Sequence, residues 1–306
     1  MRVLLLGADG FIGRRVADRF FTDPELQVTV LGRRDSADIR FDLASGSPGA
    51  LTRFLDAVMP RVVVNCAGAT YGTQRDLVRA NTVAVATVCE AIRRSAEPAR
   101  LIHLGSAAEY GPVSIGAAVP ESADPRPIGP YGVSKLAGTE LALSSGLDTV
   151  VLRVFDTVGP GAPAGSLFGR LAESLRRALE RGEPQVRTAD LSAFRDFVDV
   201  RDVARAVHAA AFSAATGVVN IGSGSGTRLR DAAGLLVRAA GFEGRLVEEG
   251  RSGGPIVPGQ DPGDRPGEVL WRQADVRTAR DRLGWRPRVP LEESLADVWT
   301  EIACRV

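Results

Sequence analysis

The sequence predicts an α/β protein built on a doubly wound parallel sheet, with a smaller and discontinuous second domain towards the C-terminus. Short apolar runs alternate with amphipathic stretches through the first half of the chain. A glycine-rich turn directly follows the first apolar run, and the alternation becomes irregular after about residue 159. Fully apolar strands between helices are typical of a parallel sheet that helices cover on both faces. The first half of the chain therefore supplies the sheet.

The elements expected in the first half follow one another as strand and helix. Each strand is a short run of branched apolar residues, and the helices carry apolar residues three and four positions apart. Pro60 closes the second helix because a proline cannot continue one. The expected strands are residues 3–6, 28–31, 62–65, 101–104 and 149–155, and the expected helices are 10–20, 51–58, 77–94 and 131–144.

The second half predicts fewer and more widely separated elements. A stretch rich in proline and glycine at 255–266 predicts a loop. We assign residues 1–158 with 194–224 to the sheet domain, and residues 159–193 with 225–306 to the smaller domain. The expected helices are 166–181, 202–212, 275–283 and 291–303, and the extended segments are 194–200 and 218–221.

The turn after the first strand reads Gly7-Ala8-Asp9-Gly10-Phe11-Ile12-Gly13 and leads into a helix. Gly7 allows a tight turn, Gly10 lets the backbone approach a pyrophosphate, and Gly13 lets the helix pack against the sheet. The helix N-terminus, with its free N–H groups, favours the negative charge of phosphates. The turn therefore predicts a Rossmann-like site for NAD(H) or NADP(H), with Phe11 and Ile12 as part of the motif.

The end of the second strand bears on the choice of cofactor. NAD sites usually place an acid about 20 residues after the glycines, where it binds the ribose hydroxyls. Here Arg33 and Arg34 follow the strand, and guanidinium groups suit the 2′-phosphate of NADP. Asp35 comes next and could serve NAD if the loop is shifted. We expect NADP(H) as the favoured cofactor, with NAD(H) possible.

Tyr131 and Lys135 are the candidate catalytic pair. They lie one helical turn apart on the same helix face, and Lys135 is the only lysine in the chain. The pKa of a free tyrosine is about 10, and a nearby ammonium and an oxidised nicotinamide would lower it towards neutrality. The phenol could then exchange a proton as an acid–base catalyst. Ser106 lies just beyond the strand 101–104, where such sheets bind ligands, and its hydroxyl could hold the reacting oxygen.

Composition and charge exclude several classes of function. The formal net charge is +1 at pH 7, so the chain predicts no nucleic-acid partner and no attraction to a membrane surface. No apolar run is long enough to span a bilayer. Three widely separated cysteines form neither a metal pattern nor an evident disulfide framework, so no metal and a cytoplasmic location are expected.

Together these motifs resemble the extended short-chain dehydrogenase/reductase family, the NAD-dependent epimerase/dehydratase group. Further matches are Asn65-Cys66-Ala67-Gly68, Arg195 to Ala204, Asn220 to Gly224, Arg265 to Glu268, and Leu283 to Pro287. The resemblance implies that Asp42 and Leu43 approach the adenine and that Ala67 lies near the nicotinamide, with Gly68 and Asn81 also on the cofactor side. It implies a nucleotide-sugar substrate whose diphosphate is held by Arg195 and Arg265. It also implies a homodimer formed through helices 77–94 and 131–145.

Departures from the family narrow the reaction. Ala107 and Ala108 follow Ser106 where the 4,6-dehydratases carry an Asp-Glu pair, so elimination of water is not expected. We expect an NADPH-dependent reductase of an NDP-4-keto-6-deoxyhexose, with hydride delivered to C4 and Tyr131 as proton donor. A nucleotide-sugar 4-epimerase with tightly bound NAD uses the same three residues and stays open. A reductase of a polyketide-type ketone and a non-catalytic NADP-binding sensor are further alternatives.

Overall fold

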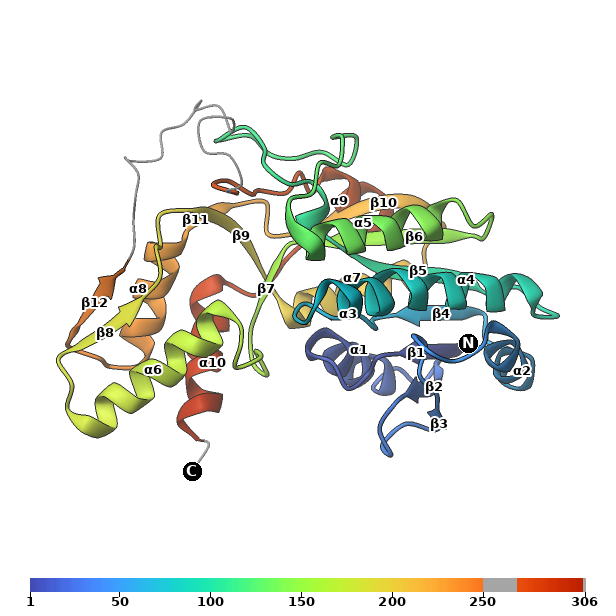
Figure 1. The fold of residues 1–306 in the computed structure, drawn as a ribbon, viewed down its shortest axis with the longest axis horizontal. Helices are drawn as coiled ribbons and strands as arrows, with labels where there is room; N and C mark the ends of the chain where they lie inside the picture. Colours follow the sequence, from blue (N-terminus) through green and yellow to red (C-terminus); the bar gives the residue numbers. More distant parts are fainter. Residues whose placement is uncertain (250–268, 305–306) are drawn as a thin grey trace.

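The computed structural model describes residues 1–249 and 269–304 and shows a large lobe beside a smaller one (Figure 1). Among the described residues, one sheet of seven parallel strands forms the large lobe, in the order β10-β6-β5-β4-β1-β2-β3. The fold class expected from the sequence is confirmed. The strands are β1 (Arg2–Leu6), β2 (Gln27–Gly32), β3 (Ile39–Arg40), β4 (Val62–Asn65), β5 (Arg100–Ser106), β6 (Thr149–Val154) and β10 (Gly217–Ile221).

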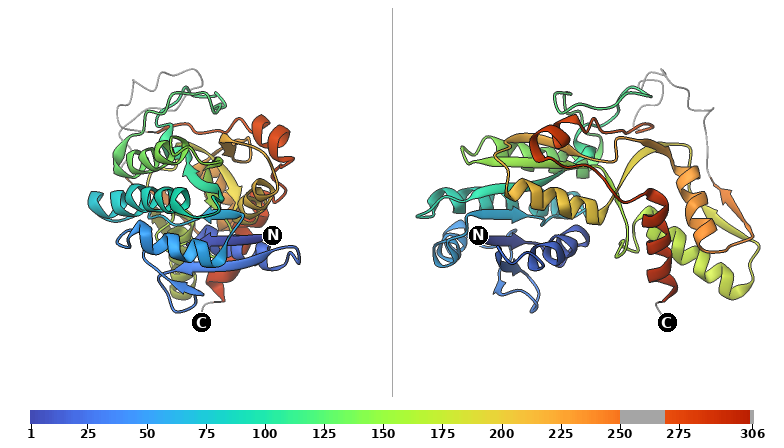
Figure 2. Two further views of the ribbon diagram at one scale, coloured as in Figure 1. Left: turned by 90° about the vertical axis from the view of Figure 1, so that its right-hand side faces the viewer. Right: turned by 180° about the vertical axis from the view of Figure 1, so that it is seen from behind.

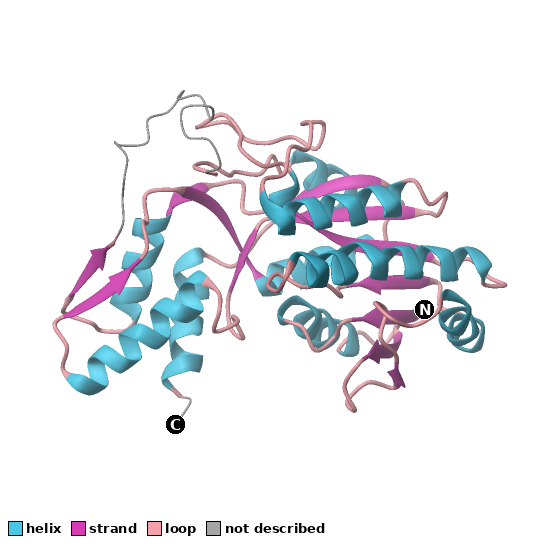
Figure 3. Cartoon of the chain, in the orientation of Figure 1, coloured by secondary structure: helices cyan, strands magenta, loops and turns pink. Residues whose placement is uncertain are grey.

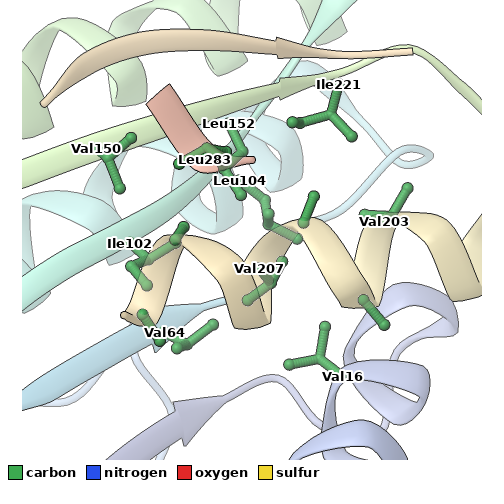
Figure 4. Close-up of a cluster of buried hydrophobic side chains, with 14 of the residues drawn as sticks. Val16, Val64, Ile102, Leu104, Val150, Leu152, Val203, Val207, Ile221 and Leu283 are labelled. Carbon is green, nitrogen blue, oxygen red and sulfur yellow. The ribbon is translucent and has the colours of Figure 1, made fainter. Parts of the chain in front are cut away.

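Helices cover both faces of this sheet, as the apolar strands require. Val16, Val203 and Val207 pack under one face against the strand residues Val64 and Ile102 (Figure 4). The helices of that face are α1 (Phe11–Phe21), α7 (Val200–Ala211) and α9 (Arg277–Leu283). Those of the opposite face are α2 (Pro48–Val58), α4 (Ala84–Arg94) and α5 (Gly129–Leu143).

The helix expected at residues 77–94 is interrupted by a π-helical turn. Helix α3 (Gln74–Val78) begins at Thr73, whose side chain forms a capping box with Asp76. A π-helical turn at Arg79–Val83 then joins α3 to α4. Such turns occur frequently at functional sites because they rotate side chains out of the regular helical register. Here the turn carries Asn81 towards α5.

Among the residues that the structure describes, three helices and a two-stranded sheet form the smaller lobe around a common apolar core (Figure 3). Its helix 229–239 and its strands were not expected from the sequence. The helices are α6 (Leu167–Arg181), α8 (Leu229–Ala239) and α10 (Leu291–Ala303), and the paired strands are β8 (Gln185–Thr188) and β12 (Arg245–Glu248). A third sheet, β11 (Gly226–Arg228), β9 (Phe194–Asp199) and β7 (Asp156–Val158), lies between the lobes in Figure 1 and in the view from behind (Figure 2, right).

Three aspartates of β9 and α7 tie the lobes together. Buried Asp196 accepts hydrogen bonds from the backbone N–H groups of Gly224 and Ala274, each at 2.9 Å. Asp199 accepts one from Ser294 of α10 at 2.6 Å. Asp202 accepts one from the N–H of Val289 at 3.0 Å. The aspartates of residues 195–204 therefore accept hydrogen bonds that link β9 and α7 to segments distant in the sequence.

Helix α9 departs from the domain division that we expected. Ala279 and Leu283 pack into the core under the large sheet, and so does Trp285, whose indole N–H donates to Asp202 O at 2.9 Å. This segment lies within residues 225–306, which the sequence assigned to the smaller domain. No helix in residues 1–249 and 269–304 has the length and apolarity needed to cross a bilayer.

Candidate active site

The glycine turn brings β1, α1 and the segment after β4 into direct contact. Gly7 has φ of +78°, and a Cβ there would lie 2.7 Å from Cα of Ala67. A Cβ on Gly13 would lie 2.0 Å from the carbonyl oxygen of Gly7. Only glycine fits at either position, so both residues shape the turn. Gly10, at the N-terminus of α1, is exposed and leaves the backbone N–H groups accessible.

A cavity of about 590 Å³ opens beside this turn at the carboxyl ends of β1, β2 and β4. Its volume lies in the range of small-molecule and cofactor sites. The glycine cradle, the helix N-terminus and the arginines fit a dinucleotide. The lining residues are Gly7, Asp9, Gly10, Leu31, Gly32, Arg33, Arg34, Phe41, Asp42, Leu43, Ala44, Cys66, Ala67, Gly68, Ala69, Asp76, Arg79, Ala80 and Ala84.

Eight of the residues expected to bind the cofactor therefore line the cavity: Gly7, Gly10, Arg33, Arg34, Asp42, Leu43, Ala67 and Gly68. Asp42 is fixed there because its carboxylate accepts from the N–H of Ala44 at 3.0 Å. Burial alone would raise the pKa of Asp42. Hydrogen bonds from Ala44 and Ser45 and the charges of Arg33 and Arg79 bring that pKa below its ordinary value.

Four other expected cofactor residues support the cavity and do not line it. Gly13 packs on the turn, Ile12 packs against the core under the sheet, and Phe11 packs against the core of the smaller lobe. Asn81 is buried, and its amide nitrogen donates to Ala69 O at 2.8 Å and to Ser134 Oγ at 3.0 Å. Asn81 thereby fastens the loop after β4 to helix α5.

The structure brings Ser106, Tyr131 and Lys135 together at the carboxyl end of β5. Ser106 ends this strand and caps a 3₁₀ turn, Ala107–Glu109. A Cβ on Gly132 would lie 2.6 Å from the carbonyl oxygen of Ala108, so α5 rests on that turn. The Tyr131 phenol lies close enough to the Ser106 side chain for the Ser106 hydroxyl to affect its pKa. Lys135 donates from Nζ to Leu104 O at 2.6 Å.

Electrostatics at this site differ in one respect from expectation. Burial raises the pKa of Tyr131 above its ordinary value, while the hydrogen bond from Ser106 and the charge of Arg272 oppose the rise. Desolvation of the phenolate therefore opposes the lowering of the pKa that was expected from Lys135 and an oxidised nicotinamide. Burial also lowers the pKa of Lys135, against the charge of Glu109.

Lys135 lies near the part of the cavity that Cys66 lines. Burial raises the pKa of the Cys66 thiol to about 12, and the Lys135 charge opposes that rise.

Glu109 was not anticipated from the sequence. Its side chain is fully buried and accepts from the Ser106 N–H at 2.7 Å and from Thr139 Oγ1 at 3.0 Å. It also accepts from Arg153 Nε at 2.7 Å. Glu109 therefore joins β5, β6 and α5 directly behind the candidate catalytic residues.

Arginines gather on the side of the smaller lobe. Arg195 donates to Phe194 O at 2.8 Å and to Val269 O at 2.7 Å, and burial lowers its pKa to about 10. Arg272, which the sequence did not single out, pairs with Asp156 at 3.1 Å. Its Nε is buried and has no partner among the described residues. The charges of Arg272 and Asp156 act on both Tyr131 and Arg195, so these groups face one region. Arg265 lies outside the described residues.

Comparison with known proteins places the chain in a family. The model of the NAD dependent epimerase/dehydratase family matches residues 3–222. The dTDP-6-deoxy-L-talose 4-dehydrogenase (NAD(P)(+)) of Kitasatospora kifunensis is 39% identical, over 98% of this chain and 95% of the relative. This chain belongs to the NAD dependent epimerase/dehydratase family, as the sequence motifs predicted.

Two solved structures extend the comparison. MoeE5 in complex with UDP-glucuronic acid and NAD is 29% identical, with a TM-score of 0.80 over 98% of this chain and 99% of the other. RMD from Pseudomonas aeruginosa complexed with NADPH has the same fold, with a TM-score of 0.84 over 100% and 99% of the two chains and 23% identity. The 39% identical relative is named for NAD(P)(+) and MoeE5 is in complex with NAD, in agreement with the expected cofactors.

Proposed function

We propose that this chain is an NAD(P)(H)-dependent 4-ketoreductase that acts on a nucleoside-diphosphate-linked 4-keto-6-deoxyhexose. The observation that carries the proposal is the placement of the Tyr131 phenol beside the Ser106 side chain, with Lys135 buried one helical turn away. The 39% identical relative is a 4-dehydrogenase of a dTDP-linked 6-deoxy sugar, and its cofactor is NAD(P)(+). Oxidation at C4 by such an enzyme is the reverse of the reduction that we propose here.

The residues of the chain would manage the proton and the oxygen. When bound, the reduced cofactor supplies hydride chemistry at C4. Ser106 would hold the C4 carbonyl oxygen, and Tyr131 would donate its phenolic proton to that oxygen. A tyrosine phenol is protonated at neutral pH, which suits a proton donor. Lys135, one helical turn away, would stabilise the phenolate that remains after proton transfer through its positive charge.

The diphosphate of the substrate would lie between the lobes. Arg195 and Arg272 supply the positive charge that phosphate oxygens attract, and Asp156 holds Arg272 in place. We propose that the lobe containing α6, α8 and α10 contributes to this subsite, and that residues 1–158 with 194–224 hold the dinucleotide. The buried Nε of Arg272, which has no partner in the part of the chain that the structure describes, would gain from such an anion.

Two properties of the whole protein complete the proposal. Val83 in the π-helical turn and Val133 and Leu141 on α5 are exposed apolar side chains on adjacent helices. We propose that they form the centre of a homodimer interface, since exposed apolar patches mark association surfaces. All three cysteines are free, which agrees with a reducing cytoplasm.

The test is turnover of dTDP- and GDP-linked 4-keto-6-deoxyhexoses, followed by the loss of reduced-nicotinamide absorbance. The wild type is expected to oxidise NADPH or NADH with one of these sugars. Y131F should lower kcat by about 10²–10⁴-fold, the usual contribution of a positioned acid. Y71F is the matched control because Tyr71 is 62% exposed and its hydroxyl only donates to Gly165 O.

Three outcomes would contradict the proposal. Wild-type turnover by Y131F would show that Tyr131 is not the proton donor. Failure to oxidise either cofactor with any of these sugars would contradict the proposed reduction. Sugar interconversion without added cofactor, by protein that carries NAD, would assign the chain to the epimerases.

A further inference from the structure

We propose that Asp9, within the glycine turn, supplies the carboxylate that binds the adenosine ribose of NAD(H). In the same cavity, Arg33 and Arg34 bind the 2′-phosphate of NADP(H). This inference deepens the proposed function on its cofactor side and rests on it only for the class of cofactor. The proposal gives the recognition of the ribose to Asp9, although residues of the glycine motif do not ordinarily have this role.

This chain has no acidic residue at the position where a ribose-binding acid usually lies. Such an acid normally follows the second strand of the fold, and here Arg33 follows β2. The nearest acid in the sequence, Asp35, pairs with Arg40 at 2.8 Å and its side chain is 88% exposed. Asp35 is not among the residues that line the cavity. The loop is therefore not shifted in the way that would let Asp35 serve NAD.

Asp9, in the neighbouring glycine turn, places a carboxylate beside the end of β2. It lines the cavity together with Gly32 and the two arginines. A Cβ added to Gly32 would lie 3.5 Å from Oδ2 of Asp9, so the carboxylate rests against the end of β2. The carboxylate therefore lies within van der Waals distance of the position where β2 ends.

The two oxygens of Asp9 have different roles. Oδ1 accepts a hydrogen bond from the Ser36 hydroxyl at 3.0 Å, which fixes the carboxylate and closes the loop 33–37 over the glycine turn. Oδ2 accepts no hydrogen bond from the described residues and faces the end of β2. An oriented carboxylate with one free oxygen is a strong acceptor for a ribose hydroxyl.

The arginines supply the opposite charge at the same place. Arg33 and Arg34 line the cavity, are exposed, and form no ion pair with any described residue. A 2′-phosphate would gain from their charge and would be repelled by Asp9, whereas a 2′-hydroxyl would gain from Asp9. The balance of these charges sets the cofactor preference and allows both dinucleotides to bind.

The test is direct binding of NADH and NADPH to the full chain without any sugar, followed by nicotinamide fluorescence. D9N removes the charge and keeps the shape, and it should lower the ratio Kd(NADPH)/Kd(NADH) by about tenfold or more, the value of a lost charged hydrogen bond. Replacing both arginines, R33Q/R34Q, should raise the same ratio. D35N is the matched control, because an exposed acid outside the cavity should leave both constants unchanged.

Several results would overturn the assignment. An unchanged ratio in D9N would show that Asp9 does not read the ribose, and a shifted ratio in D35N would give that role to the acid after β2. Circular dichroism and thermal unfolding check the fold of each variant. D9S, which retains a small polar side chain, carries the same prediction if D9N does not fold. Wild-type protein that binds both dinucleotides but reduces no keto-sugar would overturn only the proposed function.

Discussion

The carboxylate of Glu109 accepts a hydrogen bond from Nε of Arg153 at 2.7 Å, and the two side chains are 0% and 3% exposed. Removing one partner of a buried ion pair leaves the other charge uncompensated, at a cost of about 3–5 kcal/mol. We expect E109Q to lower the free energy of unfolding by about 3 kcal/mol in a urea titration. E140Q, at an exposed position of α5, should change it by no more than about 0.5 kcal/mol. Equal effects of the two variants would show that the buried pair contributes nothing.

Substitutions of two glycines of the turn, Gly13 and Gly10, should have different effects, the first on stability and the second on dinucleotide binding. A Cβ at position 13 would lie 2.0 Å from a backbone oxygen, whereas the nearest atom to one at position 10 lies at 3.4 Å. G13A should therefore unfold at a lower temperature than wild type because α1 must move. G10A should keep the wild-type melting temperature and lose dinucleotide affinity, since its methyl group covers the accessible helix N-terminus. A G10A variant that binds normally would contradict the placement of the phosphates there.

A histidine on α7 gives the stability a dependence on pH. The His208 ring nitrogen Nε2 lies 2.6 Å from Oδ2 of Asp23, and this hydrogen bond is the main cause that lowers the pKa of Asp23. A carboxyl whose pKa is lowered by folding stabilises the protein above its unfolded value of about 3.9. That contribution disappears as the pH falls through the folded value. Urea midpoints should drop less steeply between pH 5 and acid for H208L than for wild type, and parallel curves would argue against the pair.

The apolar patch on α5 should control assembly. V133E places a charge at a side chain that is 52% exposed, next to the exposed Leu141 and Val83. Burying an unpaired charge in an interface is unfavourable, so V133E should sediment as a monomer where wild type sediments as a dimer. L179E, at a residue that is 41% exposed on α6, should leave the dimer intact. Monomeric wild-type protein would refute the dimer proposal.

The sequence predicted the large lobe well because its signals are local. Runs such as Val62–Asn65 are buried on both faces and contain no polar interruption before Asn65. The candidate catalytic pair was also a local signal, since Tyr131 and Lys135 are four residues apart on one helix.

The smaller lobe gave weaker signals. The buried face of α8 consists of Ala232, Ala233 and Leu236, and alanines contribute little to an apolar pattern. Strands β8 and β12 are four residues each and are about 60 positions apart, so their pairing is a tertiary property. Glu109 and Asp9 were missed for a related reason. A single acidic residue in a loop is expected to be exposed, and its tertiary contacts are not evident from the sequence.

The cavity beside the glycine turn is lined entirely by residues between Gly7 and Ala84, whereas Ser106, Tyr131 and the arginines of the sugar side all lie beyond that stretch. The residues that we propose to select the dinucleotide therefore form one continuous segment of the chain. We expect that exchanging residues 7–84 with those of a homologue would change the cofactor preference and leave Ser106, Tyr131 and Arg195 unaltered.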